Sequence, residues 1–145
     1  YRAWEKTGVR FHYVSGSPWQ LYPPLAEFVR DHHFPAGSFH MKLFRPTDRS
    51  ATNLFGSQIE YKKSEITSLF EKFPRDRFIL VGDSGEQDAT IYAELARENP
   101  RQVSRILIRN VTDESLDTFR ETFAGLPDDL WQVFREPSEI TFQLR

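Results

Sequence analysis

The chain has 145 residues and a formal net charge of -2, with 39% hydrophobic and 28% charged residues. This balance is typical of a globular domain and excludes a disordered chain. Since no overall basic field exists, no nucleic-acid partner is expected. The absence of cysteine excludes disulfides, thiolate nucleophiles and cysteine-based zinc sites.

The first residues predict a helix end, a strand, a turn and a second helix. Residues 1–8 are expected to form the last turns of a helix that ends at a glycine. Residues 9–14 are rich in β-formers and predict a strand, and the Ser-Gly-Ser-Pro sequence of residues 15–18 predicts the turn into a helix. Apolar spacing places that helix over residues 19–33, although Pro23-Pro24 should break or restart it.

The rest of the chain alternates between strand and helix patterns. Residues 77–81 are almost uninterruptedly apolar, which is typical of a parallel strand buried on both faces. The other expected elements are a strand over residues 38–44, a polar surface loop over 45–57, an amphipathic helix over 58–73 closed by Pro74, a helix through Ile91, Tyr92, Leu95 and Ala96 stopped by Pro100, a strand over 103–111, a helix over 113–123 capped by Thr112 or Asp113, and an irregular end from Trp131 with one short strand.

This alternation predicts an α/β fold, a three-layer Rossmann-like core with about four parallel strands in one domain over residues 1–145. Ligands bind such sheets at the carboxyl ends of the strands. Two expected strands end in polar, glycine-containing turns, at residues 15–17 and 82–85. Candidate site residues are therefore sought there.

Two acidic residues follow the buried strand. Asp83 ends the strand and Asp88 lies five residues on, at the expected start of the next helix. A loop there can turn both carboxylates toward one point, and hard oxygen ligands suit Mg²⁺. The alternative is that Asp83 only ends the strand and Asp88 only caps the helix.

A hydroxyl and two lysines are the other candidates. Ser15 with the bare backbone of Gly16 could bind a phosphate oxygen, or could be part of an ordinary turn. Lys62 and Lys63 are expected at the start of the helix before the Gly-Asp strand. A lysine near a phosphoryl group neutralises charge in the transition state, but a Lys-Lys pair is usually a solvated surface feature.

Two segments resemble a known family. Residues 11–22 (FHYVSGSPWQLY) and residues 78–88 (FILVGDSGEQD), the latter with Ile91-Tyr92, are similar to the actin-patch-associated phosphatidate phosphatases of the haloacid-dehalogenase (HAD) superfamily. The resemblance extends from Tyr1 to about Val111. It implies that Ser15 and Gly16 bind the substrate phosphate and that Asp83 and Asp88 hold Mg²⁺. It also implies that Lys62, or else Lys63, stabilises the nucleophile and the phosphate.

The chain departs from the family pattern in one respect. Members carry an Asp-x-Asp-Asp-Thr motif, with the nucleophile and the general acid/base, and these 145 residues contain none. The motif and its strand are expected upstream of Tyr1, so the chain alone is expected to be inactive. The resemblance implies hydrolysis of phosphatidate to diacylglycerol through an aspartyl-phosphate, with possible peripheral membrane contact. A cytoplasmic location is expected if no upstream signal exists.

Several alternatives stay open at this point. The protein could be a HAD phosphatase for a soluble phosphoester, or a non-catalytic module that binds phosphate or a lipid headgroup. A serine hydrolase based on Gly82-Asp83-Ser84-Gly85 is disfavoured, because the histidines lack a recognisable partner motif. His32, His33 and His40 could suggest a metal cluster, but adjacent histidines at a helix end point in different directions and are better explained by charge complementarity at the helix C-terminus. Trp19 and Tyr22 could contact lipid, whereas Leu21 and Leu25 are expected in the core.

Overall fold

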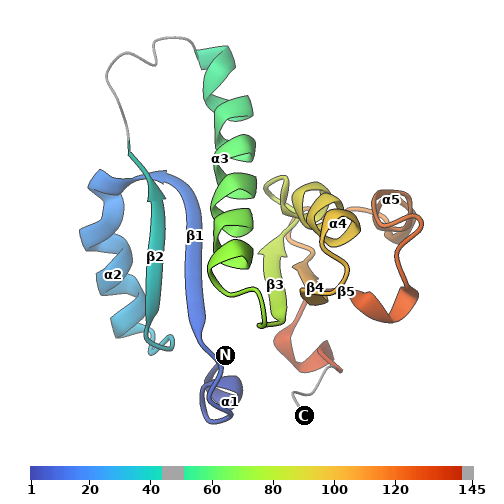
Figure 1. Cartoon of the computed structure of the whole chain (residues 1–145), viewed down its shortest axis with the longest axis horizontal. Helices are drawn as coiled ribbons and strands as arrows, with labels where there is room; N and C mark the ends of the chain where they lie inside the picture. Colours follow the sequence, from blue (N-terminus) through green and yellow to red (C-terminus); the bar gives the residue numbers. More distant parts are fainter. Residues whose placement is uncertain (44–50, 142–145) are drawn as a thin grey trace. The chain divides into compact units, whose positions relative to one another are not determined.

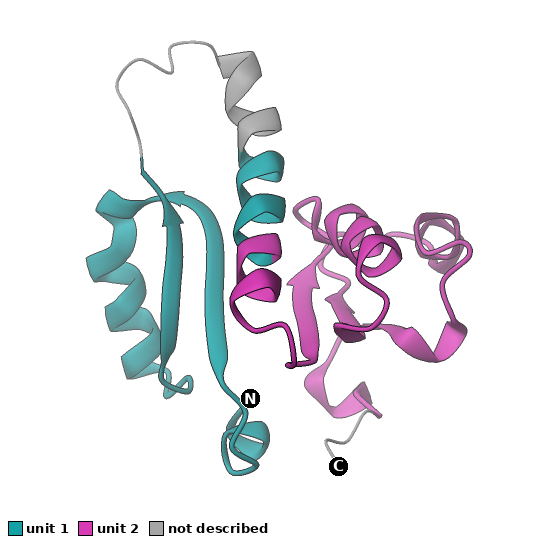
Figure 2. Cartoon of the chain, in the orientation of Figure 1, with its two compact units in different colours: residues 1–66, 143–145 teal, residues 67–142 magenta. Residues whose placement is uncertain are grey.

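The computed structural model describes the backbone of residues 1–43 and 51–141, and the side chains of residues 1–43 and 58–141. The chain forms two compact units (Figure 2). Unit 1 includes Tyr1–Ile66, and unit 2 is Thr67–Phe142. Each unit is described by itself below, and the expectation of a single domain over residues 1–145 stays a prediction.

Unit 1 is built on two parallel strands, β1 (Phe11–Pro18) and β2 (Gly37–Lys42) (Figure 1). The connection between them contains a short 3₁₀ turn, η1 (Trp19–Leu21), and the helix α2 (Tyr22–Asp31). Parallel neighbours need such a crossover, and a helix usually supplies it. The short helix α1 (Arg2–Glu5) precedes β1, and the following turn contains Gly8 with a φ of 81°, as expected for a glycine after a helix end.

Two expectations in unit 1 change in detail. The strand β1 continues through residues 15–18, where a turn was expected, and its pairing with β2 becomes irregular between Ser15 and Pro18. Pro23 and Pro24 lie in the first turn of α2, where the missing N–H costs no helical hydrogen bond. Of the two expected outcomes, a broken or a restarted helix, the second is observed, because α2 starts at these prolines.

The long helix α3 (Ala51–Lys72) corrects the predicted loop over residues 45–57. The loop is wrong for residues 51–57, because the helix begins at Ala51. The remaining part, residues 45–50, lies outside the described residues. The predicted end of the helix before Pro74 is confirmed.

Unit 2 contains the three parallel strands β3 (Phe78–Asp83), β4 (Val103–Arg109) and β5 (Trp131–Phe134), in that order in the sheet. The helix α4 (Asp88–Glu98) connects β3 to β4, and α5 (Leu116–Thr122) follows β4. The apolar run over residues 77–81 was predicted to be buried on both faces, and this is true only of Leu80, because Phe78, Ile79 and Val81 are half-buried. The fully buried run is the centre of β4, residues 106–108, as is typical of a central parallel strand. The hydroxyl of Tyr92 on α4 donates to the carbonyl of Val81 at 3.1 Å and ties the helix to β3.

The helix after β4 begins later than predicted. Ser115 is its N-cap, and its hydroxyl oxygen accepts from the backbone N–H of Thr118 at 3.3 Å. The predicted caps, Thr112 and Asp113, belong instead to the preceding loop. The short strand expected near the C-terminal end is confirmed as β5, which lies between the 3₁₀ turns η2 (Asp128–Leu130) and η3 (Pro137–Glu139).

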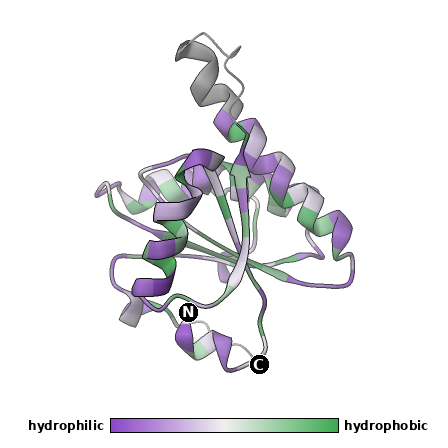
Figure 3. Ribbon diagram, turned by 90° about the vertical axis from the view of Figure 1, so that its left-hand side faces the viewer, coloured by the Kyte–Doolittle hydropathy of each residue, from purple (hydrophilic) through white to green (hydrophobic). Residues whose placement is uncertain are grey.

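The fold class is confirmed as α/β, since all described strand pairs are parallel and are joined by helices. The described residues contain five strands, instead of about four, and these are divided into the β1–β2 pair and the β3–β4–β5 sheet. The helices carry hydrophilic and hydrophobic residues along the same length (Figure 3), which is typical of helices that cover a core on one face. Within the described residues, no helix is long and apolar enough to span a bilayer.

Candidate functional site

The loop after β3 brings together the two predicted metal ligands. Asp83 is the last residue of β3, and its Oδ1 accepts from the N–H of Gly85 at 2.8 Å, which closes the turn. Asp88 is the first residue of α4 and is only 4% exposed. Its Oδ2 accepts from the backbone N–H of Asp83 at 3.2 Å. The two carboxyl groups are therefore held within one short loop.

Glycine at position 82 makes this arrangement possible. A β-carbon built on Gly82 would lie 2.6 Å from both the Cβ and the Cγ of Asp88, a separation that real Cβ atoms do not adopt. A β-carbon on Gly85 would lie 3.0 Å from Oδ1 of Asp83. Gly82 thus provides the space for the Asp88 side chain. In the sequence, the need for glycine at position 82 is visible only as the Gly-Asp pair, which by itself does not indicate what the glycine does.

The alternative assignment of Asp88 as a helix cap is not what the structure shows. The N-cap of α4 is Gln87, which makes no side-chain capping bond, and the Asp88 carboxylate bonds back to the β3 end. The described residues contain no group of three or more His, Cys, Asp or Glu that could hold a metal ion. A pair of carboxylates at a strand end nevertheless fits Mg²⁺, which accepts hard oxygen ligands and usually keeps several waters.

A side-chain network holds the same loop to the next one. The Ser84 hydroxyl oxygen accepts from the N–H of Val111 at 2.9 Å and from that of Thr112 at 3.1 Å, and it lies 2.6 Å from the Thr112 hydroxyl. The backbone N–H of Ser84 also donates to the carbonyl of Arg109 at 2.9 Å. In the sequence, Ser84 stands out only as a possible nucleophile, and no local pattern predicts this contact with the next loop.

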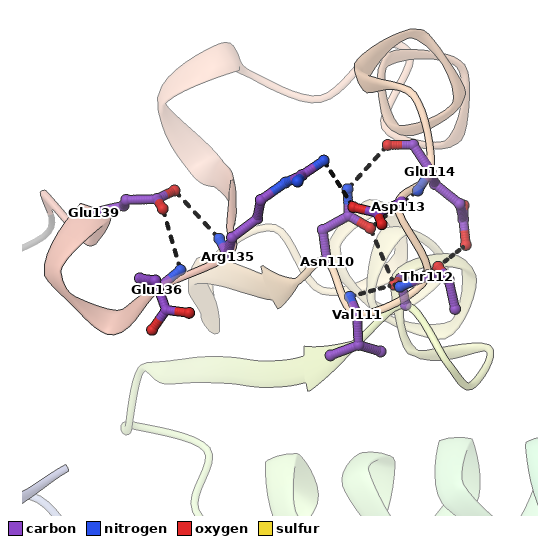
Figure 4. A network of polar contacts seen from close by, with 9 residues as sticks. Asn110, Val111, Thr112, Asp113, Glu114, Arg135, Glu136 and Glu139 are labelled. Atoms are coloured by element: carbon purple, nitrogen blue, oxygen red, sulfur yellow. Dashed lines mark hydrogen bonds and ion pairs between the residues drawn. The ribbon is translucent and has the colours of Figure 1, made fainter.

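The loop after β4 is held by hydrogen bonds and an ion pair of its own (Figure 4). Asn110 donates to the carbonyl of Glu114 at 2.9 Å and accepts from its N–H at 3.1 Å. Asp113 adopts a positive φ of 58° and pairs with Arg135 at 2.8 Å. The Asp83 loop is therefore attached, through Ser84, to a neighbouring loop that has its own hydrogen bonds.

Ser15 and Gly16 lie at the irregular end of β1 in unit 1. The Ser15 hydroxyl oxygen accepts from the backbone N–H of Ser17 at 3.2 Å, which folds the chain locally around it. A β-carbon on Gly16 would lie 3.3 Å from the Cβ and Cγ of Gln58 on α3. The small residue therefore lets the strand approach the helix closely, a role that the sequence did not indicate.

The lysines lie elsewhere on their helix than expected. Both Lys62 and Lys63 are in the interior of α3, not at its start, because the helix begins at Ala51. The Lys62 side chain is buried, with 8% of its surface exposed, whereas Lys63 is half-buried. A buried lysine is uncommon unless it has partners, so the solvated-surface alternative is wrong for Lys62.

The structure thus gathers the predicted residues into two sets. Ser15, Gly16 and Lys62 belong to unit 1, and Asp83 and Asp88 belong to unit 2. The roles that the resemblance implies for these residues stay predictions. The meeting of both sets around one phosphate stays a prediction.

Comparisons with known proteins identify relatives of this chain. The sequence model of the family described as "Phosphatidate phosphatase APP1, catalytic domain" matches residues 1–110. The chain is 33% identical to Phosphatidate phosphatase APP1 of Saccharomyces cerevisiae over 95% of its own length and 24% of that protein. It is 30% identical to an uncharacterized protein of Schizosaccharomyces pombe, C29B5.04c, over 79% of the chain and 18% of that protein.

The chain spans about a quarter or less of the length of these relatives. No solved structure matches it. The family match covers most of the chain and includes the β1 end, the interior of α3 and the Asp83 loop. The chain therefore belongs to the family of phosphatidate phosphatase APP1 catalytic domains.

Proposed function

We propose that the protein containing this chain is a Mg²⁺-dependent phosphatase that hydrolyses phosphatidate to diacylglycerol. The observation that carries the proposal is the family match over residues 1–110, within which the Asp83–Asp88 carboxylate pair is built into a rigid strand-end loop. Carboxylates in this position suit a magnesium ion that offsets phosphate charge.

In this proposal the groups of unit 1 bind the phosphate. The Ser15 hydroxyl and the backbone of Gly16 contact its oxygens, and the Lys62 ammonium stabilises negative charge as the phosphoryl group is transferred. The burial of Lys62 supports its choice over Lys63, because a charge acts more strongly where water is excluded. Asp83 and Asp88 would hold Mg²⁺, which when bound neutralises charge on the phosphate.

The nucleophile is proposed to lie outside these 145 residues. An aspartate of an upstream Asp-x-Asp-Asp-Thr motif would form the phosphoenzyme, and a second aspartate would move the proton. The residues of the present chain would then bind, orient and neutralise, but would not attack the phosphorus. Purified 145-residue chain should accordingly release no phosphate.

A lipid substrate has a suitable surface next to the end of β1, where the phosphate is proposed to bind. Trp19, Leu21 and Phe28 are 44%, 49% and 48% exposed, and the first two lie in η1, directly after β1. Leu21 had been expected in the core, and that expectation is wrong. The Trp19 ring stacks on Tyr22 with centroids 4.8 Å apart. Exposed aromatic and apolar side chains are favourable at a membrane interface, so we include peripheral membrane contact in the proposal.

The test uses the full-length protein and measures phosphate release from phosphatidate in vesicles and from a soluble phosphate monoester. We expect release from the lipid that requires added Mg²⁺ and stops with a chelator. Preference for the soluble ester would favour a HAD phosphatase of another substrate class. Binding of phosphatidate vesicles without turnover under any metal condition would favour a non-catalytic module and contradict the proposal.

The membrane contact has its own test. Replacing Trp19 and Leu21 by serine should reduce turnover of vesicle phosphatidate and leave turnover of a soluble monoester unchanged, because the substitutions affect access to the lipid and not the chemistry. The control is Leu116→Ser, which changes an exposed apolar residue of unit 2. Equal loss on both substrates would contradict a lipid-contacting role.

A further inference from the structure

A hydrogen-bonded chain of four side chains lies in unit 1, apart from the residues assigned above. The Nδ1 atom of His12 is 2.7 Å from the Ser38 hydroxyl oxygen, which is 2.9 Å from Nε2 of His40. The Nδ1 atom of His40 is in turn 3.2 Å from Oε2 of Glu65. A serine, an imidazole and a carboxylate are thus connected in series.

The backbone explains why these side chains meet. Ser38 and His40 are two residues apart on β2 and so lie on the same face of the strand. His12 is the register partner of Ser38 on β1, and Glu65 comes from α3. The side chains of His40 and Glu65 are 16% and 31% exposed, whereas Ser38 is exposed. The base is therefore partly shielded from water, while the hydroxyl is accessible from solution.

Proton accounting fixes the direction of each bond when the imidazoles are neutral. An ionised Glu65 only accepts, so Nδ1 of His40 carries the proton and donates to it. Nε2 of His40 is then an acceptor, and the Ser38 O–H donates to it. Ser38 has only one proton, so His12 donates its Nδ1–H to the Ser38 oxygen. In this arrangement the serine proton points at a base that is oriented by a carboxylate.

We infer that Ser38 is an activated nucleophile that reacts with small activated acyl and phosphonyl electrophiles. Its Oγ forms a bond to the carbonyl carbon or to phosphorus while its proton passes to Nε2 of His40. The bond to the leaving group breaks, and with a fluorophosphonate that group leaves as fluoride. Glu65 stabilises the imidazolium that forms, and the proton is then released to water. This reactivity is independent of the proposed phosphatase chemistry.

Ser64 provides a matched serine in the same unit. It is also exposed, but its hydroxyl donates to the carbonyl of Tyr61 at 2.8 Å, an acceptor that cannot take the proton. A general electrophile should thus modify Ser38 and not Ser64 if the imidazole activates the hydroxyl. If surface exposure alone determined the reaction, both serines would be modified at similar rates.

The experiment treats the full-length protein with a fluorophosphonate and maps the modified residues by peptide mass spectrometry over time. We expect Ser38 to be modified at least tenfold faster than Ser64. His40→Ala should bring Ser38 to the Ser64 rate, and Glu65→Gln should slow it. Glu60→Gln, which changes an exposed residue of the same helix, should leave the rate unchanged.

Equal rates at Ser38 and Ser64 in the unmodified protein would overturn the inference. So would an unchanged rate at Ser38 in His40→Ala, provided that circular dichroism shows the variant to be folded. Because the comparison of the two serines requires no substitution, a variant that fails to fold does not remove the test.

Discussion

The side chain of Asp88 lies against the backbone at Gly82, and its Oδ2 reaches past that residue to accept from the N–H of Asp83. The glycine, the strand end and the helix start are therefore one structural unit. Any side chain at position 82 would have to move the carboxylate or the strand. This contact explains why the loop needs glycine although no positive φ is recorded at position 82.

Gly82→Ala should displace Asp88 and weaken the fold. Placing a methyl group into a packed space typically costs about 1–3 kcal/mol. We expect a lower free energy of unfolding in urea, and a large loss of Mg²⁺-dependent phosphate release by the full-length protein, because one proposed ligand is moved.

Gly85→Ala is the matched control for that substitution. Its added β-carbon would lie 3.0 Å from Asp83 Oδ1, a contact that a small shift can relieve. The loss of stability and activity should therefore be smaller than for Gly82→Ala. Equal or greater damage from Gly85→Ala would contradict the role assigned to the Gly82–Asp88 contact.

Asp83→Asn should remove activity while leaving the fold intact. An asparagine can keep the acceptor that bonds to the N–H of Gly85 but lacks the charge that suits Mg²⁺. We expect phosphate release to fall by orders of magnitude and the urea midpoint to stay nearly unchanged. Asp117→Asn, in an exposed ion pair with Arg120, is the control and should alter neither quantity. Full activity of Asp83→Asn would remove Asp83 from the metal site.

Ser84→Ala should loosen the same loop by a different route. Its hydroxyl oxygen accepts from two backbone N–H groups, those of Val111 and Thr112, which would lose this partner. Leaving such donors unpaired typically costs about 1–3 kcal/mol. The Mg²⁺ concentration needed for half-maximal activity should rise, because Asp83 is less well positioned.

Ser104→Ala is the matched control for the Ser84 substitution. The Ser104 hydroxyl donates to the carbonyl of Phe78, near the opposite end of β3 from Asp83. A similar loss of stability is possible there, but the Mg²⁺ requirement should not change. If both variants showed the same Mg²⁺ requirement, Ser84 would have a purely structural role.

In unit 2 the sequence predicted β3 and α4 well, because β3 begins as an apolar run and Pro100 follows the end of α4. It placed Asp83 and Asp88 correctly for the same reason. It was wrong at two helix starts. The helix α3 begins at Ala51, within a segment whose polar composition predicted a loop. The cap of α5 is Ser115, which bonds locally to the N–H of Thr118, although Thr112 and Asp113 are equally suitable cap residues by type. The contact between Gly82 and Asp88 could not be predicted, because it depends on where one side chain turns.

Ser15→Ala should raise KM for the phosphoester more than it lowers stability. The hydroxyl accepts only a long, 3.2 Å bond from the N–H of Ser17 among the contacts described, so its removal leaves the strand pairing intact. Loss of a phosphate contact that is equal in ground and transition states raises KM without changing kcat. Ser38→Ala, on the neighbouring strand, is the control. An unchanged KM for Ser15→Ala would exclude Ser15 from phosphate binding.

The free energy of unfolding should depend on pH in the alkaline range because of Tyr61, a residue of unit 1. Burial, with a smaller contribution from the charge of Glu65, raises the pKa of Tyr61 from 10.0 to about 12. A raised pKa means that the folded state favours the neutral phenol. Its contribution to stability is therefore fully present below about pH 10 and is lost as the pH rises through about 12.

Tyr61→Phe removes this titration while keeping the ring. The free energy of unfolding of the unmodified protein should fall between pH 10 and pH 12 by more than that of the variant. Glu65→Gln should lower the pKa of Tyr61, because it removes the neighbouring negative charge. Glu60→Gln, an exposed change on the same helix, should not. This pKa can be measured from the absorbance of the phenolate. Parallel stability curves for the protein and Tyr61→Phe would show that burial does not hold this phenol neutral.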